Sequence, residues 1–380
     1  MKKIGITGQN GFVGSNLFNT LKLHNEFEIV DFKKHYFDDQ TQLDQFVNKC
    51  DVIVHLAALN RHEDQEVIYN TNIKLVQKLI QAAKNTDQQP HIIFSSSTQE
   101  ERDNLYGRSK KEGRQLFHEA ANQGILNFTG LLIPNVFGAF CKPFYNSFIA
   151  TFCHQLTHGK QPEIHQDAEV QLIYVQELIR EIIHVIKNET YRGTYHVEAP
   201  QEIKVSEVLY QLNNFKRLYF DKGEIPELTS VFRTNLFNTF RSYIDHRNHF
   251  PVKFTKHSDD RGSFVEIIRL GVGGQVSFST TKPGIARGNH YHIRKIERFA
   301  VIKGKALIQL RKIGTDDVIN FELDGEQPAF VDMPIWYTHN IKNIGNEILY
   351  TNFWINETFD ADDADTWFEK VEKPEFYKTR

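Results

Sequence analysis

The chain has few cysteines, almost no excess charge and no long apolar segment. Its 380 residues include only 3 cysteines, too few for a disulfide framework, so we expect a reducing, cytoplasmic environment. The 45 Lys and Arg residues against 48 Asp and Glu residues give a net charge of -3, which argues against nucleic acid as a partner. Gly8 and Gly11 interrupt the apolar run near the start, so we expect no signal peptide. A membrane span needs about 20 apolar residues, and because no segment has them we expect no membrane partner.

The pattern of apolar residues changes along the chain and predicts two unlike domains. Residues 1–245 alternate strand-like and helix-like segments, which predicts an α/β Rossmann-type fold, a doubly wound parallel sheet with helices on both faces. Its expected strands are Lys3–Thr7, Phe27–Phe32, Val52–Leu56, His91–Phe94 and Asn127–Ile133. Residues 246–380 carry short strand-like runs between turns, which predicts an all-β sandwich or barrel. Those runs are Gly262–Arg269, Gly274–Ser279, Arg298–Ile302, Lys305–Leu310, Asp317–Leu323, Ala329–Met333 and Glu347–Asn352.

A glycine-rich turn follows the first expected strand. Gly8, Gly11 and Gly14 suit, in that order, a tight turn, the close approach of a pyrophosphate and the packing of a helix on the sheet. The helix expected over Val13–Leu23 would direct its free N–H groups at the phosphates. The turn therefore predicts a dinucleotide-binding site.

The residues after the second expected strand leave the choice of nucleotide open. Asp31 follows the glycines by about 20 residues, the position of an acid that bonds an adenosine ribose hydroxyl, which favours NAD. Lys33 and Lys34 come next and could hold the additional phosphate of NADP. The alternative for each lysine is an ordinary solvated turn.

A serine, a tyrosine and a lysine form a candidate catalytic set. Ser97 ends the fourth expected strand, and Tyr106 precedes Lys110 by one helical turn, so that the ammonium lies beside the phenol. We expect the cation to lower the pKa of the phenol and make it a usable proton donor or acceptor. Ser97 would hydrogen-bond a substrate carbonyl. A serine-rich turn and a surface tyrosine are the alternatives.

These motifs resemble the extended short-chain dehydrogenase/reductases, which act largely on nucleotide sugars. The resemblance covers residues 1–245 and also rests on His55 to Ala58, Asn72 and Pro134 to Gly138. It implies cofactor contacts from Gly8, Gly11, Phe12, Val13, Gly14, Asp31, Lys33, Lys34, Leu56, Ala57, Ala58, Tyr106, Lys110, Pro134 and Asn135. Ser97 and Tyr106 are only nine residues apart, closer than in the family, so Ser96 remains an alternative to Ser97.

Histidines in the second domain form a candidate metal site. His290 and His292 lie two apart, so on a strand they point to the same face, and Glu297 follows after a turn. His339, from a distant strand, completes a set of three imidazoles and a carboxylate, which suits zinc, iron, nickel or manganese. The alternative for each histidine is an ordinary core or surface residue.

The second domain resembles two families that differ in the role of His290. The histidine spacing is similar to the two cupin motifs, which implies a jelly-roll barrel and metal ligation by His290, His292, Glu297 and His339. Asp259 to Glu266 and Ala286 to His292 resemble the dTDP-4-dehydrorhamnose 3,5-epimerases, which implies a base at His290 and no need for metal. A metallated imidazole nitrogen is unavailable as a base, so His290 is either ligand or base.

The whole chain resembles a family of capsular polysaccharide synthesis enzymes in which a reductase is fused to a C-terminal cupin. Cys141 to Ser147, Ala150 to Cys153 and Lys282 to Ile285 carry this resemblance. It implies that the cupin epimerises carbon 3 of a UDP-4-keto-6-deoxy-N-acetylhexosamine and that the reductase reduces the 4-keto group with NADPH. The product would be UDP-2-acetamido-2,6-dideoxy-L-talose, for N-acetyl-L-fucosamine in capsular or O-antigen polysaccharide. The resemblance also implies cupin-bound Zn2+ and a homodimer formed through the cupin.

Two other functions stay open from the sequence. The first is an internal-redox nucleotide-sugar epimerase or dehydratase with an accessory sugar-binding cupin, which would keep its cofactor tightly bound. The second is a non-catalytic sensor of nicotinamide redox state, which the presence of Ser97, Tyr106 and Lys110 disfavours.

Overall fold

A computed structural model describes residues 1–189, 193–260, 262–265, 267–268, 273–357 and 360–372. The chain divides into two compact units, the first made of residues 1–151 and 164–205 and the second of residues 152–163 and 206–380. Residues 206–245, which the sequence pattern placed with the first domain, thus group with the second unit. The boundary between the two activities, at residue 245, stays a prediction.

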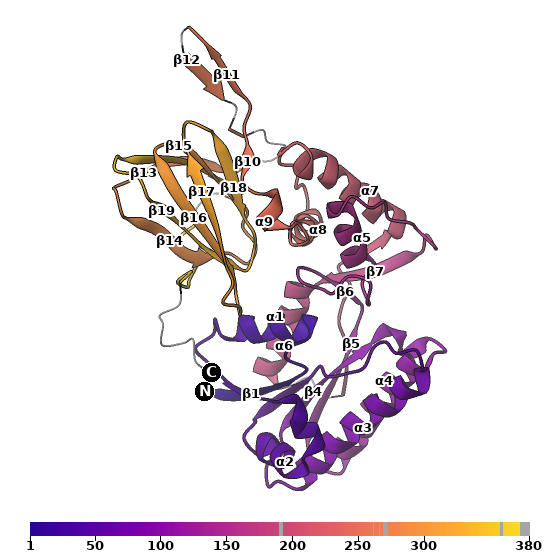
Figure 1. Ribbon diagram of the computed structural model, residues 1–380. Helices are drawn as coiled ribbons and strands as arrows, with labels where there is room; N and C mark the ends of the chain where they lie inside the picture. Colours follow the sequence, from indigo (N-terminus) through magenta and orange to yellow (C-terminus); the bar gives the residue numbers. More distant parts are fainter. Residues whose placement is uncertain (190–192, 261, 266, 269–272, 358–359, 373–380) are drawn as a thin grey trace. The chain divides into compact units, whose positions relative to one another are not determined.

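The first unit is built on a parallel sheet of six strands in the order β2-β1-β3-β4-β5-β8 (Figure 1). The strands are β1 (Lys2–Thr7), β2 (Phe27–Val30), β3 (Val52–His55), β4 (His91–Ser97), β5 (Asn127–Ile133) and β8 (Gly193–His196). In the sheet, β2 pairs with one side of β1 and β3 pairs with the other. The carboxyl ends of β1 and β3 therefore flank a topological switch point, where such sheets bind ligands.

Helices cover both faces of this sheet (Figure 1). The helices of the first unit are α1 (Phe12–Leu21), α2 (Gln40–Asn48), α3 (Gln65–Lys84), α4 (Leu105–Asn122) and α6 (Val175–Asn188). On one face, fully buried Leu43, Leu79 and Phe117 join strand residues in a single apolar core. The short helices η1 (Lys34–Asp38) and η2 (Thr98–Glu101) follow β2 and β4. The predicted Rossmann-type α/β fold is confirmed.

A small second sheet extends the first unit beyond β5. It contains β6 (Asn135–Phe137), β7 (Glu169–Tyr174) and β9 (Gln201–Lys204), in that order. The helix α5 (Phe148–Thr157) lies between β6 and β7 in the sequence. This arrangement brings Pro134 and Asn135 to the carboxyl end of β5, beside the end of β4.

The second unit begins with helices. They are α7 (Val205–Phe215), the π-helical turn η3 (Lys216–Phe220), α8 (Val231–Arg241) and α9 (His246–His249). A buried ion pair ties this segment to the strands: Arg298 donates to Asp332 at 2.8 and 3.0 Å, and the Tyr219 hydroxyl donates to the same carboxylate at 2.6 Å. Because lone buried charges are costly, this network explains why the helices group with the β domain.

Two five-stranded antiparallel sheets form the body of the second unit (Figure 1). The first contains β10 (Val252–Lys253), β18 (Ala329–Met333), β15 (Glu297–Lys303), β20 (Leu349–Ile355) and β13 (Gln275–Thr281), in that order. The second contains β17 (Val318–Asp324), β16 (Lys305–Lys312), β19 (Tyr337–Asn343), β14 (Ala286–Tyr291) and β21 (Trp367–Phe368). Buried apolar side chains from both sheets share one core, which confirms the predicted cupin-like all-β domain.

The strands β11 (Lys256–Asp259) and β12 (Gly262–Val265) form a hairpin. The strand β12 is shorter than the one expected over Gly262–Arg269. Arg261 and Glu266 of the epimerase-like motif lie outside the described residues. Among the residues that the structure describes, no helix is both long and apolar enough to cross a membrane.

Candidate functional site

The glycine-rich turn adopts a conformation that only small residues allow. Gly8 has φ +77, in the left-handed region that favours glycine, and its carbonyl accepts the Gly11 N–H at 2.9 Å. A Cβ on Gly14 would lie 2.2 Å from the Gly8 carbonyl oxygen, so the start of α1 packs directly on the turn. No side chain caps α1, which leaves its first N–H groups available to a phosphate.

A cavity of about 230 Å³ opens beside this turn at the carboxyl ends of the strands. Nine of the residues expected to bind cofactor or substrate line it: Phe12, Val13, Leu56, Ala58, Ser97, Tyr106, Lys110, Pro134 and Asn135. Asn60, Gln99, Cys141, Asn146 and Ser147 line it as well. The sequence assigned no role to these five residues. Three of them, Cys141, Asn146 and Ser147, lie in the segment Cys141 to Ser147 that carries the resemblance of the whole chain to the reductase–cupin family.

The remaining expected cofactor residues lie outside the lining. Gly8 packs against the backbone of Ala57, since a Cβ there would lie 2.7 Å from the Ala57 nitrogen. Asp31, Lys33 and Lys34 are exposed just after β2, next to β1 in the sheet. Their roles toward the adenosine end of a dinucleotide stay predictions.

The three serines at the end of β4 have different partners. Ser95 donates to the His55 carbonyl at 3.1 Å. Ser96 is 4% exposed and donates to the carboxylate of Glu100. Ser97 caps η2 by accepting the Gln99 N–H at 3.1 Å, so its own proton can point into the cavity. The arrangement favours Ser97 over Ser96 as the serine that meets a substrate.

Glu100 was not found from the sequence. Its carboxylate is 9% exposed and takes hydrogen bonds of 2.8 to 3.1 Å from the guanidinium of Arg114. Glu100 lies on η2, in the short connection between Ser97 and Tyr106, and Arg114 lies on α4. No spacing rule links η2 to α4, so only the fold reveals this contact.

Tyr106 and Lys110 both line the cavity, but the expected effect on the phenol is wrong. Burial raises the pKa of Tyr106 to about 12, and Tyr145 adds to the rise. The Lys110 ammonium lies 5.9 Å from the Tyr106 ring centroid and donates instead to the Ser95 carbonyl at 2.8 Å. Burial lowers the pKa of Lys110 itself to about 8, partly offset by Glu100. Desolvation therefore outweighs the cation, and Tyr106 stays a protonated phenol, which suits a proton donor.

Asn72 holds the active-site helix to the loop after β3. Its side chain accepts the Leu59 N–H at 2.7 Å and donates to the Leu59 carbonyl at 3.1 Å and to Ser109 at 3.1 Å. Ser109 precedes Lys110 on α4, so this buried amide fixes the helix that carries the lysine relative to the loop that lines the cavity.

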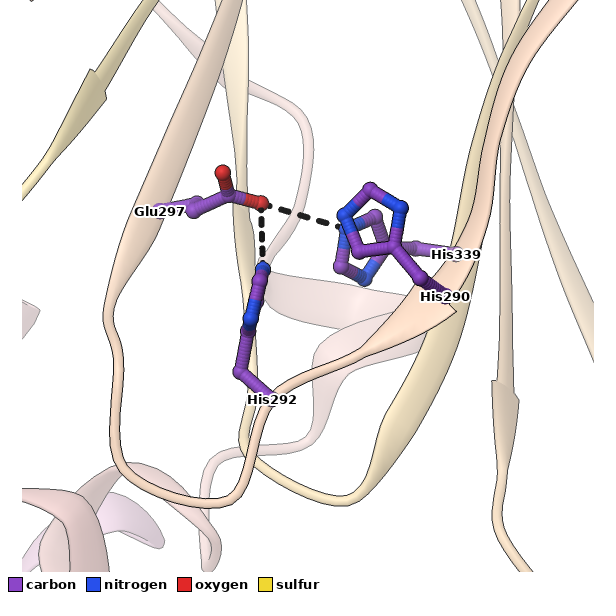
Figure 2. Close-up of side chains that lie close together, drawn as sticks. All are labelled: His290, His292, Glu297 and His339. Carbon is purple, nitrogen blue, oxygen red and sulfur yellow. Dashed lines mark ion pairs between the residues drawn. The ribbon is translucent and has the colours of Figure 1, made fainter. Parts of the chain in front are cut away.

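The second unit gathers His290, His292, Glu297 and His339 at one point (Figure 2). One ligand atom from each lies within 4.8 Å of the others, and Figure 2 shows the side chains pointing toward one another. Glu297 Oε2 lies 3.0 Å from His292 Nε2 and 3.2 Å from His339 Nε2. His290, His292 and Glu297, which are close in the sequence, thus meet His339 from a distant strand.

The protons of the two buried imidazoles face away from this point. His292 Nδ1 contacts the Asp365 carbonyl at 2.5 Å, and His339 Nδ1 contacts the Tyr337 carbonyl at 3.2 Å. A carbonyl only accepts, so each Nδ1 carries a proton, and in the neutral ring that a metal requires each Nε2 presents a lone pair. His292 Nε2, His339 Nε2 and Glu297 Oε2 are buried without hydrogen-bond partners. Three converging lone pairs fit a divalent cation, and the carbonyl contacts are typical of metal-ligating histidines.

Charge balance in the cluster favours an ionised carboxylate. Burial would raise the pKa of Glu297, but His292 and His339 outweigh it and hold that pKa well below its usual range. Burial works against protonation of His292, yet contact with Glu297 raises its pKa. For His290, burial lowers the pKa to about 4, with a further contribution from His339.

His290 differs from the other three residues in its exposure. It is partly exposed, whereas His292, Glu297 and His339 are buried. A bulge in β14, with Asn289 at φ +63, shifts the register just before His290 and pairs it with His339. His292 lies one residue beyond the end of β14. The structure brings His290 to the cluster and leaves its role, ligand or base, open.

The first unit has the architecture of a dinucleotide-dependent reductase or epimerase, and the second has that of a cupin-like barrel. Residues 4–197 match the NAD dependent epimerase/dehydratase family, and the chain belongs to that family. It is accordingly an enzyme of reductase/epimerase type that uses a nicotinamide cofactor. Residues 257–367 match the polysaccharide biosynthesis C-terminal domain.

Two of the similar proteins match nearly the whole chain. The chain is 33% identical to a UDP-2-acetamido-2,6-beta-L-arabino-hexul-4-ose reductase from Pseudomonas aeruginosa, over 96% of this chain and 98% of the relative. The crystal structure of the capsular polysaccharide assembling protein CapF from Staphylococcus aureus is similar with 34% identity and a TM-score of 0.59, covering 97% of this chain and all of that one. RMD from Pseudomonas aeruginosa, complexed with NADPH, shares the fold at 19% identity and a TM-score of 0.55, over 64% of this chain and 99% of its own.

Proposed function

We propose that the chain is a bifunctional UDP-sugar enzyme that makes UDP-2-acetamido-2,6-dideoxy-L-talose. The cupin domain epimerises carbon 3 of a UDP-4-keto-6-deoxy-N-acetylhexosamine, and the reductase domain then reduces the 4-keto group. The observation that carries the proposal is the presence of two intact sites in one chain, the Ser97–Tyr106–Lys110 cavity and the His/Glu cluster. The 33% identity to a UDP-hexulose reductase over nearly the whole chain supports it.

The reduction uses groups that line the cavity of the first unit. Bound NADPH supplies the hydride to carbon 4. Ser97 donates a hydrogen bond to the carbonyl oxygen and so polarises it. Tyr106, kept protonated by burial, donates its proton to that oxygen as the hydride arrives, and the hydroxyl is complete. Lys110, held by the Ser95 carbonyl, places a positive charge near the phenolate that remains.

The epimerisation uses the acidity that the 4-keto group gives to carbon 3. Removal of the carbon-3 proton would leave an enolate, and a proton delivered from water on the other face would invert the centre. We assign proton removal to partly exposed His290, and the holding of Zn2+ to His292, Glu297 and His339, whose lone pairs converge without partners. The bound cation supplies positive charge that balances Glu297 and fixes the two histidines.

The choice of NADPH and a homodimer formed through the cupin are parts of the same proposal. Lys33 and Lys34, exposed beside Asp31, would meet the additional phosphate. On the edge strand β13, Phe278 is 73% and Val276 53% exposed, and Tyr350 on the neighbouring β20 is 40% exposed. A second copy would cover these side chains. Light scattering should find a dimer, and Phe278→Ser should yield monomers.

The test follows both reactions in one sample. The protein is incubated in deuterated water with the UDP-4-keto-6-deoxy-N-acetylhexosamine, with and without NADPH, and proton NMR records loss of the carbon-3 signal while absorbance records NADPH. Tyr106→Phe should reduce NADPH oxidation by about 100-fold and leave deuterium exchange unchanged, because the exchange uses other residues. Tyr210→Phe, which changes a 69% exposed phenol, is the matched control.

Two outcomes would contradict the proposal. If the sugar neither exchanges its carbon-3 proton nor oxidises NADPH or NADH, both assigned reactions are wrong. If the sugar is converted while added NADPH is untouched and a cofactor stays bound, the chain is an internal-redox epimerase or dehydratase with an accessory cupin.

A further inference from the structure

Asp365 lies in the segment after β20 and binds the loop that joins two residues of the His/Glu cluster. Its carboxylate accepts three consecutive backbone N–H groups of residues 293–295: Oδ1 accepts at 3.1 Å, and Oδ2 accepts at 3.0 and 2.9 Å. Its backbone carbonyl accepts His292 Nδ1 at 2.5 Å. The residue is 5% exposed, so these bonds are made away from water.

These contacts act on both His292 and Glu297. The carbonyl of Asp365 places the proton of His292 on Nδ1, which turns the Nε2 lone pair toward Glu297 and His339. The carboxylate fixes the first three of the four residues between His292 and Glu297. Asp365 therefore sets the direction of the His292 ring and the position of Glu297 relative to His292.

The backbone of Asp365 is held in a conformation that favours glycine. Its φ is +42, in the left-handed region that few L-residues adopt. Aspartate tolerates this region better than most residues, and the four hydrogen bonds above hold it there. Such strained residues are concentrated at functional sites.

Further bonds hold the segment around Asp365 in place. Lys295, itself 2% exposed, donates from Nζ to the Ala364 carbonyl at 2.7 Å. The Trp367 indole donates to Asp365 Oδ1 at 3.3 Å. Fully buried Arg311 donates to the Val371 carbonyl at 2.8 Å and so anchors the end of the same segment. The segment is thus hydrogen-bonded on both sides of Asp365, and a residue that orients a metal ligand needs such fixed surroundings.

We propose that Asp365 is a positioning residue of the metal centre: it sets the tautomer and direction of His292 and the position of Glu297 through the loop between them. This inference rests on the proposed binding of a divalent cation by the cupin domain. Asp365 does not touch the metal or the substrate.

The test compares Zn2+ affinity in the full-length protein and four variants, by competition with a chromophoric chelator, together with the visible spectrum of the Co2+-loaded proteins. Asp365→Asn keeps the backbone carbonyl and tolerates positive φ, but it turns an NH2 group toward the loop N–H groups, so Zn2+ should bind about 10- to 100-fold more weakly. Asp365→Ala should lose at least as much. The Co2+ bands of both should shift, because the loop between His292 and Glu297 loses the carboxylate that holds it.

Asp363→Asn is the matched control. Asp363 lies two residues away and bonds the Arg294 side chain at 2.9 and 2.7 Å, with no bond to the loop backbone. Its Zn2+ affinity should stay within about threefold of the unchanged protein, as its contact is exposed. Trp367→Phe, which removes only the indole bond to Asp365, gives a second and milder variant if the others do not fold.

The outcomes separate this inference from the function on which it rests. If the unchanged protein binds no Zn2+ or Co2+, the metal centre itself is wrong. If the unchanged protein binds and the folded Asp365 or Trp367 variants bind with equal affinity and identical Co2+ spectra, Asp365 does not position the centre. A loss in Asp363→Asn equal to that in Asp365→Asn would show a general charge effect and overturn the assignment.

Discussion

Ser96 donates its hydroxyl proton to the buried carboxylate of Glu100, and this contact separates it from Ser97 in function. Glu100 is also held by Arg114, so the hydroxyl of Ser96, although Ser96 lines the cavity, is engaged by a buried ion pair. Ser97 accepts the Gln99 N–H, so its own proton stays available for the role toward a substrate carbonyl that we propose.

We therefore expect unequal effects from the two serine-to-alanine changes. Ser97→Ala should lower kcat for reduction by about 100-fold, the effect of removing one donor from a polarised oxygen. Ser96→Ala should change kcat by less than about fivefold, because Arg114 still satisfies Glu100. Steady-state NADPH oxidation measures both, and a larger loss in Ser96→Ala would mean that the serines are assigned in the wrong order.

Gly14→Ala should damage the cofactor site without touching any catalytic group. Its new Cβ would lie 2.2 Å from the Gly8 carbonyl oxygen, so the turn must shift, which costs about 1–3 kcal/mol of stability. NADPH affinity, measured by fluorescence titration, should fall by at least about 10-fold as the helix start moves from the turn. Gly273→Ala is the control, since nothing lies within 4 Å of its Cβ and no positive φ is required. Unchanged NADPH affinity in Gly14→Ala would contradict the assignment of this turn.

The buried pair of Arg298 and Asp332 predicts acid sensitivity of the second unit. Burial alone would raise the pKa of Asp332, but Arg298 and Arg241 outweigh it and lower that pKa. A carboxyl with a lowered pKa in the folded protein contributes stability that is complete above its unfolded value, near about 4, and is lost as the pH falls further. The other groups near it are Tyr219, His246 and His249, and burial favours the neutral form of both histidines.

Asp332→Asn should therefore lower the free energy of unfolding by about 3–5 kcal/mol at neutral pH, because it leaves Arg298 buried without a counter-charge. It should also flatten the loss of stability below pH about 4. Glu347→Gln, in an exposed pair with Lys303, is the control and should cost less than about 1 kcal/mol. Denaturant unfolding of metal-free protein at several pH values is the measurement, and equal costs for the two variants would refute the role of the buried pair.

The sequence predicted the site residues that are grouped by regular spacing along the chain. It did not predict the contacts that form only when distant segments fold together. Gly8 to Gly14, Tyr106 with Lys110, and His290 with His292 lie close in the chain, so regular geometry was enough to group them. Glu100 and Asp365 act through contacts between segments, and a backbone carbonyl such as that of Asp365 leaves no mark in the sequence.

The expected pKa of Tyr106 failed for a related reason. The sequence shows a lysine four residues away but not that burial of the phenol dominates or that the lysine bonds the Ser95 carbonyl. The sequence also does not show why the helices over 206–245 group with the second unit, since the buried Tyr219–Asp332 bond joins residues 113 apart.

His290→Ala tests whether the partly exposed histidine is a base or a metal ligand. Three buried donors, His292, Glu297 and His339, remain in this variant, so it should keep one equivalent of Zn2+ after dialysis. Deuterium exchange at carbon 3 should fall by at least about 100-fold, the usual effect of removing a general base. His339→Ala should instead lose the metal, because it removes one of the converging lone pairs. Elemental analysis and NMR exchange decide between the roles: equal metal loss in the two variants would make His290 a ligand and require another base.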